Sequence, residues 1–166
     1  NLTNTDELRS KLIADNAVFQ TTIDSEVMAM LINKFSDGDI VQGVLKACEY
    51  FKGSYALVVM TADKLIAVRD PYGIRPLCVG RNMDDVVVAS ESCAIDAVGA
   101  TFLRDVEPGE VLVIDSTGMH SHRMNGAEKC RSASCIFEYV YFARPDSILD
   151  GCSVYRTRML AGQILA

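Results

Sequence analysis

One aspartate and one pair of histidines are candidates for binding or catalysis. Asp24 stands where an apolar helical pattern begins. Its carboxylate could cap that helix or pair with the ammonium group of a ligand. His120 and His122 are two residues apart in a strand-like segment, so they would share one face of a sheet. They could bind a metal ion, although two histidines on one strand are more often simply solvated.

A cluster of charged residues surrounds a predicted turn. Arg69, Asp70 and Arg75 flank residues 71–73, whose proline and glycine favour a turn. The cluster could bind an anion or could hold the turn together through ion pairs, and the second interpretation is favoured. The sequence contains no glycine-rich phosphate loop and no His-Glu-x-x-His motif. Taken alone, these residues therefore give only weak signs of catalysis.

The chain has six cysteines, Cys48, Cys78, Cys93, Cys130, Cys135 and Cys152. None of them forms a Cys-x-x-Cys pair, which disfavours a zinc ribbon. The amino terminus is polar and lacks the apolar segment of a secretory signal. We therefore expect free thiols in a reducing compartment, the cytoplasm.

Composition excludes several classes of partner. The chain has 166 residues, 49% of them apolar, with 22 acidic and 16 basic side chains and a net charge of −6. This balance disfavours a nucleic-acid-binding protein. The longest apolar run, residues 55–60, is far shorter than the roughly 20 residues of a membrane span. The length suits one domain, or one domain and part of another.

Helical spacing of apolar residues predicts three helices in the first third of the chain. Asn4 and Glu7 have the spacing of a capping box at the start of the first helix. The second is expected to begin near residues 22–24, and the third to follow the polar turn at residues 36–39. Gly53 suits the C′ position of the third helix.

The rest of the chain is typical of strands. We expect a short helix at 92–98, a turn at 82–85, a linker at 125–134, a final helix after 150–151, and strands at 54–61, 65–69, 76–81, 86–90, 102–106, 111–115, 119–124 and 135–142. Strands 102–106 and 111–115 are expected to pair with each other through the turn at 107–110. Helices followed by closely spaced strands predict an α+β layered domain with mainly antiparallel sheets.

Several segments together resemble one family. Residues 53–60 (GSYALVVM) and 69–77 (RDPYGIRPL) resemble class II glutamine amidotransferases, and residues 89–100 and 106–110 continue the pattern. Residues 135–147 (CIFEYVYFARPDS) are more specific and resemble the glutamine phosphoribosylpyrophosphate amidotransferase family. This resemblance implies that residues 1–132 are the C-terminal part of a glutaminase domain, an αββα sandwich of the N-terminal-nucleophile type. Residues 133–166 would be a connecting strand and the start of a phosphoribosyltransferase domain.

The resemblance also implies a reaction. The family converts glutamine, water and phosphoribosyl pyrophosphate to 5-phosphoribosylamine, glutamate and pyrophosphate, the first committed step of de novo purine biosynthesis. Its nucleophilic cysteine and most of its oxyanion hole would precede residue 1, and its phosphate-binding loop would follow residue 166. We therefore assign no catalytic residue and expect the 166-residue chain to be inactive by itself. Half a sandwich would expose apolar surface, so we expect either the missing half as a separate chain or association between copies, with a homo-oligomer as the complete enzyme.

Two residues receive roles from the resemblance. Asp24 matches the family aspartate that pairs with the α-ammonium group of glutamine, although Ile23 replaces the usual small polar residue before it. Cys135 matches a cysteine that binds a [4Fe–4S] cluster in the iron–sulfur branch of the family, and it could otherwise be a packed cysteine at a strand start. One thiolate cannot hold such a cluster. The cluster and magnesium are thus expected in the complete enzyme and not in this chain alone.

Two other interpretations remain open. The chain could come from another class II amidotransferase such as glucosamine-6-phosphate synthase, which residues 141–147 disfavour. It could also be a non-catalytic glutaminase-like module that serves as a scaffold.

Overall fold

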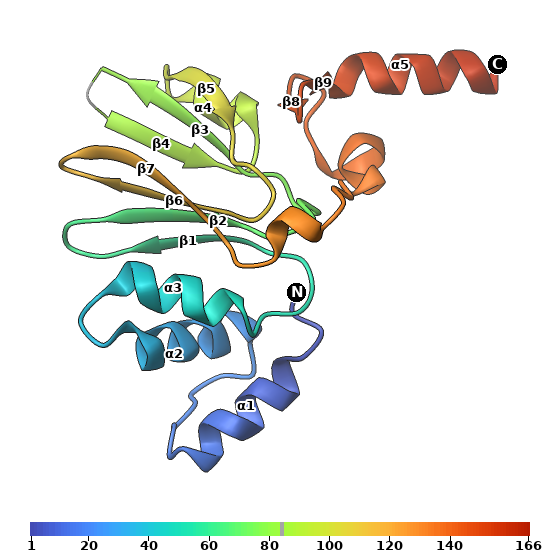
Figure 1. Cartoon of the computed structure of the whole chain (residues 1–166). Helices are drawn as coiled ribbons and strands as arrows, with labels where there is room; N and C mark the ends of the chain where they lie inside the picture. Colours follow the sequence, from blue (N-terminus) through green and yellow to red (C-terminus); the bar gives the residue numbers. More distant parts are fainter. Residues whose placement is uncertain (84) are drawn as a thin grey trace.

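A computed structural model describes residues 1–83 and 85–166 of the chain. Two antiparallel sheets lie face to face, with helices packed on the outside of each (Figure 1). Helices α2 and α3 cover the free face of the four-stranded sheet, and α4 covers the three-stranded sheet (Figure 1). The layer order is therefore α–β–β–α, which confirms the predicted α+β sandwich.

Three helices open the chain, and their apolar stripes form the largest part of the core. They are α1 (Thr5–Ala14), α2 (Asp24–Ser36) and α3 (Ile40–Cys48). Helix α2 buries four residues at helical spacing, Val27, Met28, Leu31 and Ile32. Asp39 caps α3, accepting hydrogen bonds from the backbone N–H groups of Val41 (2.9 Å) and Gln42 (3.4 Å).

Two expectations about these helices are wrong. The Asn4 side chain does not cap α1, because it donates to the Tyr50 carbonyl (2.9 Å) and accepts from the Lys52 N–H (3.1 Å). Helix α3 ends at Cys48, well before Gly53. Gly53 has φ +123°, and a Cβ there would lie 2.5 Å from the Asn1 carbonyl oxygen. The glycine is thus required for the close approach of the chain start.

The four-stranded sheet has the order β1-β2-β6-β7, with strands β1 (Ala56–Met60), β2 (Leu65–Arg69), β6 (Glu110–Asp115) and β7 (Gly118–Arg123). Its central strands are buried on both faces. Ile66 and Val68 of β2 pack against the helices, whereas Ala67 packs toward the other sheet. Each fully buried aliphatic side chain of this kind contributes about 1.5–3 kcal/mol.

The three-stranded sheet has the order β4-β3-β5, with strands β3 (Cys78–Asn82), β4 (Asp85–Ala89) and β5 (Thr101–Asp105), and α4 (Ser92–Ala97) follows β4. The predicted pairing of 102–106 with 111–115 is wrong, because β5 pairs with β3 and β6 pairs with β2 and β7. The Val106 N–H bonds to the Leu77 carbonyl, while the Gly109 N–H bonds to the Arg69 carbonyl. Residues 107–109 therefore carry the chain from one sheet to the other. The predicted turn at 82–85 includes residue 84, which lies outside the described residues.

The last forty residues differ most from expectation. The predicted linker contains a short 3₁₀ helix (Ala127–Lys129) whose Ala127 is buried in the core. Residues Glu138–Phe142 form a π-helical turn instead of the predicted strand. Among the described residues this turn pairs with no strand of either sheet, and it closes with a hydrogen bond from the Ala143 N–H to the Glu138 carbonyl (2.9 Å). A small hairpin, β8 (Ile148–Leu149) and β9 (Cys152–Ser153), leads into α5 (Val154–Leu165), which projects from the sandwich (Figure 1).

Across the described residues, every helix falls short of the length and apolarity that crossing a bilayer requires.

Gly80 in β3 gives a test of how tightly α4 packs on its sheet. A Cβ at Gly80 would lie 2.3 Å from Ile95 Cγ2 and 2.9 Å from the Thr101 carbonyl oxygen. We expect Gly80→Ala to lower the free energy of unfolding by about 1–3 kcal/mol, since both neighbours are fixed in the core. Gly162→Ala, in an open position on α5, is the control and should leave stability unchanged or raise it by up to about 1 kcal/mol. Equal melting temperatures for the two variants would contradict this packing.

Candidate functional site

A cavity of about 510 Å³ lies where α2 begins, and Asp24 is one of its walls. Four parts of the chain line it: the chain start (Asn1, Leu2), the first turns of α2 (Asp24, Ser25, Met28), the start of β1 (residues 54–57), and a group of later residues (Arg75, Pro76, Ser90, Glu91, Glu138, Phe142). Its volume is within the range of small-molecule sites.

Asp24 is the first residue of α2 and is half-buried. The N-cap of the helix is Ile23, which has no side chain able to cap, and Asp24 does not take over that function. Instead, Asp24 Oδ2 accepts a hydrogen bond from the Leu2 N–H at 3.2 Å. The structure thus places the carboxylate at the cavity wall, held by the chain start. Its pairing with a ligand ammonium group stays a prediction.

Two further carboxylates, which sequence reasoning missed, line the same cavity. Glu91 Oε2 accepts hydrogen bonds from the Arg144 N–H (2.8 Å) and the Ser147 hydroxyl (2.7 Å). Glu138 is buried, and its Oε1 lies 2.9 Å from Arg75 Nη1. Burial raises the pKa of Glu138, and the nearby Arg75 charge offsets part of that rise. The only signal in the sequence was that both glutamates fall within family-like segments.

Two members of the cluster around the predicted turn, Arg69 and Asp70, are buried and structural, whereas Arg75 is half-exposed and lines the cavity. Arg69 is 1% exposed. Its guanidinium makes five hydrogen bonds, to the carbonyls of Gly73, Arg75 and Val106 and to both carboxylate oxygens of Asp150. A guanidinium has five N–H donors, so none remains for an anion. Asp70 is also fully buried and accepts from the N–H groups of Tyr72 (3.0 Å) and Ile74 (3.1 Å). The structural interpretation is thus favoured over an anion site at Arg69. The turn is held by backbone hydrogen bonds to Asp70 and by the pair of Arg69 with the distant Asp150, and not by ion pairs within the cluster.

The two histidines lie on β7, away from the cavity lining. His120 Nε2 is 2.7 Å from the Thr117 hydroxyl, an exposed contact. Among the residues that the structure describes, no three metal-binding side chains come together. The structure thus gives no support to a metal site at His120 and His122.

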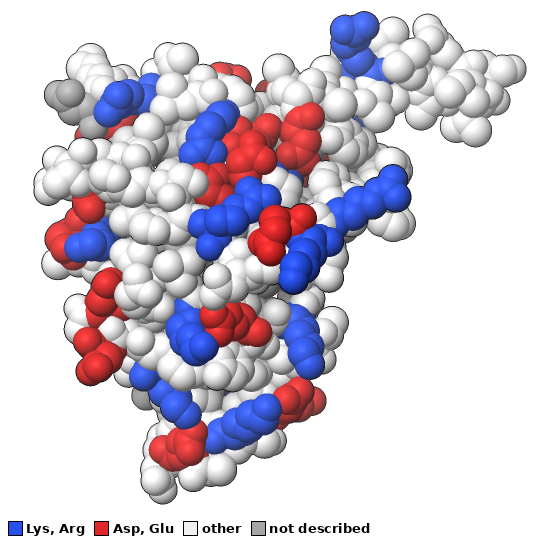
Figure 2. Space-filling view, in the orientation of Figure 1, with Lys and Arg blue, Asp and Glu red and all other residues white. Residues whose placement is uncertain are grey.

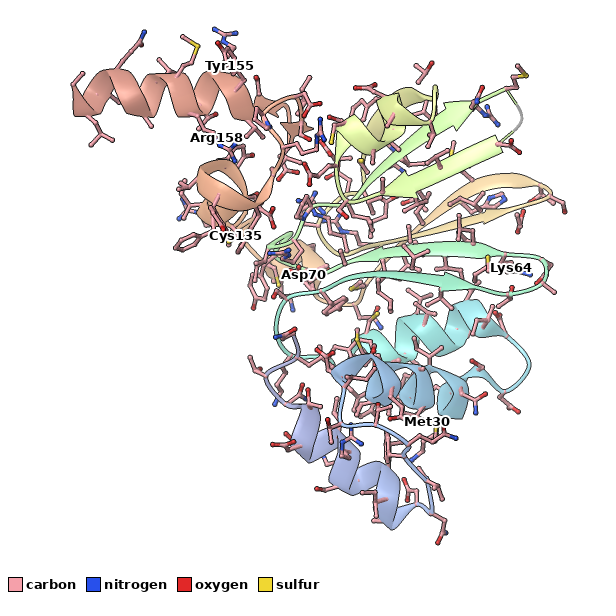
Figure 3. The ribbon with its side chains drawn as sticks, turned by 180° about the vertical axis from the view of Figure 1, so that it is seen from behind. Met30, Lys64, Asp70, Cys135, Tyr155 and Arg158 are labelled. Atoms are coloured by element: carbon pink, nitrogen blue, oxygen red, sulfur yellow. The ribbon has the colours of Figure 1, made fainter. Side chains whose placement is uncertain are left out.

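Cys135 is half-buried at the entry to the π-helical turn, and its N–H donates to the Ile74 carbonyl (3.2 Å). Figure 3 places it beside this turn, which Arg158 of α5 holds from the other side. Arg158 donates to the carbonyls of Tyr139 and Ala143, both at 2.7 Å. By contrast, burial raises the pKa of the Cys48 and Cys78 thiols to about 12, so these two are unreactive core residues.

Acidic and basic side chains are intermixed over the face shown in Figure 2. The projecting helix carries positive charge near its start and is uncharged beyond it (Figure 2). The exposed apolar residues there are Met159, Leu160, Ile164 and Leu165.

Comparison with known proteins agrees with the fold. A family model described as a glutamine amidotransferase domain matches residues 1–97. The chain belongs to this family of glutamine amidotransferases.

Its relatives are amidophosphoribosyltransferases. The enzyme of Archaeoglobus fulgidus is 46% identical over 168 residues, which cover 100% of this chain and 36% of the relative. That of Bacillus subtilis is 42% identical over 166 residues, covering 100% of this chain and 34% of the relative. A solved structure of glutamine phosphoribosylpyrophosphate amidotransferase from B. subtilis, complexed with ADP and GMP, has a TM-score of 0.88 and 43% identity. The match covers 93% of this chain and 33% of that one.

These relatives confirm the resemblance inferred from residues 135–147. The chain spans about a third of the length of the relatives that it matches.

Asp150 gives a test of the contact that holds residues 134–154 against the sandwich. We expect Asp150→Asn to lower the free energy of detaching this segment by roughly 3 kcal/mol, because the substitution leaves the buried Arg69 guanidinium without its charged partner. Hydrogen exchange at the Val154 amide, which bonds to the Ser147 carbonyl, measures the change. Asp146→Asn is the control, since the Arg144–Asp146 pair is fully exposed and solvent screens it.

The same contact should depend on pH. Burial alone would raise the pKa of Asp150, but hydrogen bonds from Arg69 and Ser134 outweigh it and lower the pKa. The ionised carboxylate therefore adds stability that is complete above its unfolded pKa of about 3.9 and is lost as the pH falls through the lower folded value. The protection factor of the Val154 amide, which is its exchange rate relative to the intrinsic rate at the same pH, should fall in acid in the parent chain and much less in Asp150→Asn. Equal acid responses would contradict the role of this pair.

Proposed function

We propose that this chain forms part of the glutamine site of an amidophosphoribosyltransferase. The complete enzyme would convert glutamine, water and phosphoribosyl pyrophosphate to 5-phosphoribosylamine, glutamate and pyrophosphate, the step that commits metabolism to purine synthesis. The observation that carries the proposal is the placement of Asp24 in the wall of a cavity of about 510 Å³, within a chain of this family. Residues 133–166 would lead into the phosphoribosyltransferase domain, which would hold the sugar donor and magnesium.

Asp24 is suited to recognise the α-ammonium group of glutamine. It is half-buried, so water screens a charge pair there less than at an open surface. The Leu2 N–H occupies one carboxylate oxygen, Oδ2, and restrains the side chain. The other oxygen, Oδ1, remains available for a charge-assisted hydrogen bond to an ammonium group. The α-ammonium group would thus fix the orientation of glutamine in the cavity.

Replacing Asp24 with Asn in the complete enzyme tests this role. The amide keeps the size of the side chain but loses its charge. We expect the KM for glutamine to rise roughly 10- to 100-fold, because a hydrogen bond to a charged group contributes about 1.5–3 kcal/mol. Steady-state measurement of glutamate release gives both KM and kcat, and kcat should change much less.

Asp37→Asn makes the same chemical change immediately after the other end of α2, at an exposed residue outside the cavity. This variant should keep the KM of the parent enzyme. An unchanged KM in Asp24→Asn would reject the assignment.

We further propose that Cys135 supplies one thiolate to a [4Fe–4S] cluster in the complete enzyme. The support is its family-like segment, together with a half-buried thiol that forms no disulfide and a backbone fixed by Ile74. Such a cluster needs four thiolates, and the described residues bring no three metal-binding side chains together. The other three ligands would come from residues after 166. The cluster would bind this turn to the domain that follows.

Iron analysis of the complete protein tests the assignment. We expect about four iron atoms per chain, and a loss of most of them in Cys135→Ser. Cys130→Ser is the matched control, since Cys130 is also half-buried and free but lies five residues earlier, near the 3₁₀ helix. Iron-free complete protein, or full iron content in Cys135→Ser, would show that Cys135 is only a packed thiol.

The complete enzyme is also proposed to act in the cytoplasm as a homo-oligomer. Free thiols at all six cysteines suit a reducing compartment. The exposed apolar residues of α5 and of the π-helical turn would be covered in such an assembly.

A further inference from the structure

The cavity lining contains one basic side chain, Arg75, and a distant part of the chain holds it from two sides. Glu138 Oε1 lies 2.9 Å from Arg75 Nη1. The Arg75 guanidinium carbon also lies 5.3 Å from the centre of the Phe142 ring, within the range of a cation–π contact. Both partners belong to the π-helical turn at residues 138–142. This turn, more than sixty residues away in sequence, therefore sets the position of Arg75.

Burying the carboxylate of Glu138 lowers the stability of the fold. It is 5% exposed, and its Oε1 is buried without a hydrogen bond of good geometry, even though the Arg75 guanidinium is close. A buried carboxylate with an incompletely used oxygen costs stability that an apolar residue of similar size would not. Glu138 also lines the cavity. A buried, incompletely paired carboxylate at a cavity wall is typical of a functional position.

The turn that carries Glu138 and Phe142 is itself fixed from the C-terminal side. Arg158 of α5 donates to the carbonyl of Tyr139 within the turn and to that of Ala143 directly after it (Figure 3). Ser147 and the backbone of Arg144 are bound by Glu91, another cavity residue. Any displacement of α5 or of residues 144–147 would thus reach the cavity wall directly.

We propose that Glu138 is a positioning residue of the glutamine cavity, which together with Phe142 holds the Arg75 guanidinium in the cavity wall. The shape and charge of that wall then depend on the position of residues 138–158 relative to the sandwich. This inference rests on the proposed function of the cavity, and it adds a residue that does not itself need to touch glutamine.

The test uses the complete enzyme and a matched pair of substitutions. Glu138→Gln keeps the shape of the side chain and removes the charge that holds Arg75. Glu110→Gln is the control, because Arg104 and Glu110 form an arginine–carboxylate pair of similar exposure outside the cavity lining, in which Glu110 also accepts from the Glu107 N–H. The contact is 2.8 Å, with side-chain exposures of 42% and 2%, against 43% and 6% for Arg75 and Glu138. Both variants should lose thermal stability. Only Glu138→Gln should change the kinetics of glutamine.

We expect Glu138→Gln to raise the KM for glutamine about tenfold while kcat stays within about threefold. Because the two side chains act as one unit, Arg75→Gln should raise KM to a similar degree, and the double variant should be no worse than either single one. Arg75→Lys keeps the charge at a half-exposed site and should fold, but it loses the planar contact with Phe142. It should therefore also raise KM.

The outcomes separate this inference from the proposed function. A parent enzyme that releases no glutamate from glutamine would refute the proposed function itself. If Asp24→Asn raises KM but neither Glu138→Gln nor Arg75→Lys does, only the role of Glu138 is wrong. An equal rise of KM in Glu110→Gln would also overturn it, because the effect would then come from general loss of stability. Should Glu138→Gln fail to fold, Glu138→Asp, which keeps the charge but shortens its reach toward Arg75, must raise KM for the proposal to stand.

Discussion

The buried guanidinium of Arg69 is the interaction on which most of this structure depends. Its five hydrogen bonds join the end of β2, the turn at 73–75, the crossing at Val106 between the two sheets, and Asp150 of the final hairpin. A buried charge costs several kcal/mol unless all its donors are paired. Four separate segments must therefore come together for Arg69 to be buried at all. This requirement makes their arrangement specific even if it adds little net stability.

The two sheets on either side of Arg69 contribute differently to the core. The four-stranded sheet packs its buried aliphatic residues against α2 and α3 and forms most of the core. The three-stranded sheet forms smaller clusters with α4 and with the inner face of its neighbour. The cavity lies beyond the packed layers, at the ends of elements, where backbone groups and polar side chains are still available. Such a location suits a binding site, since a rigid scaffold holds residues that the core does not consume.

The cavity combines contributions from distant parts of the sequence. Asp24 comes from the first turn of α2, Arg75 from the turn that Arg69 holds, and Glu138 from the π-helical turn. The proposed glutamine site therefore depends on the region between residues 133 and 158 as well as on the glutaminase-like sandwich. Hydrogen bonds from Arg158 and contacts of Glu91 make that dependence physical, because they leave the later segment little freedom to move independently.

The sequence by itself determined the helices α2 and α3, most strands, the α+β class and the family, because apolar periodicity and turn residues are local signals. It also pointed to Asp24, through a motif carried by contiguous residues. Only the tertiary structure decided that β5 and β6 belong to different sheets, since pairing depends on which strand edges are available. It likewise turned residues 138–142 into a helical turn, despite their β-branched and aromatic composition. Asp150 as the partner of Arg69, and Glu138 as the partner of Arg75, required contacts across more than sixty residues. No local pattern encodes such contacts, because they form only when distant segments pack together in the folded chain.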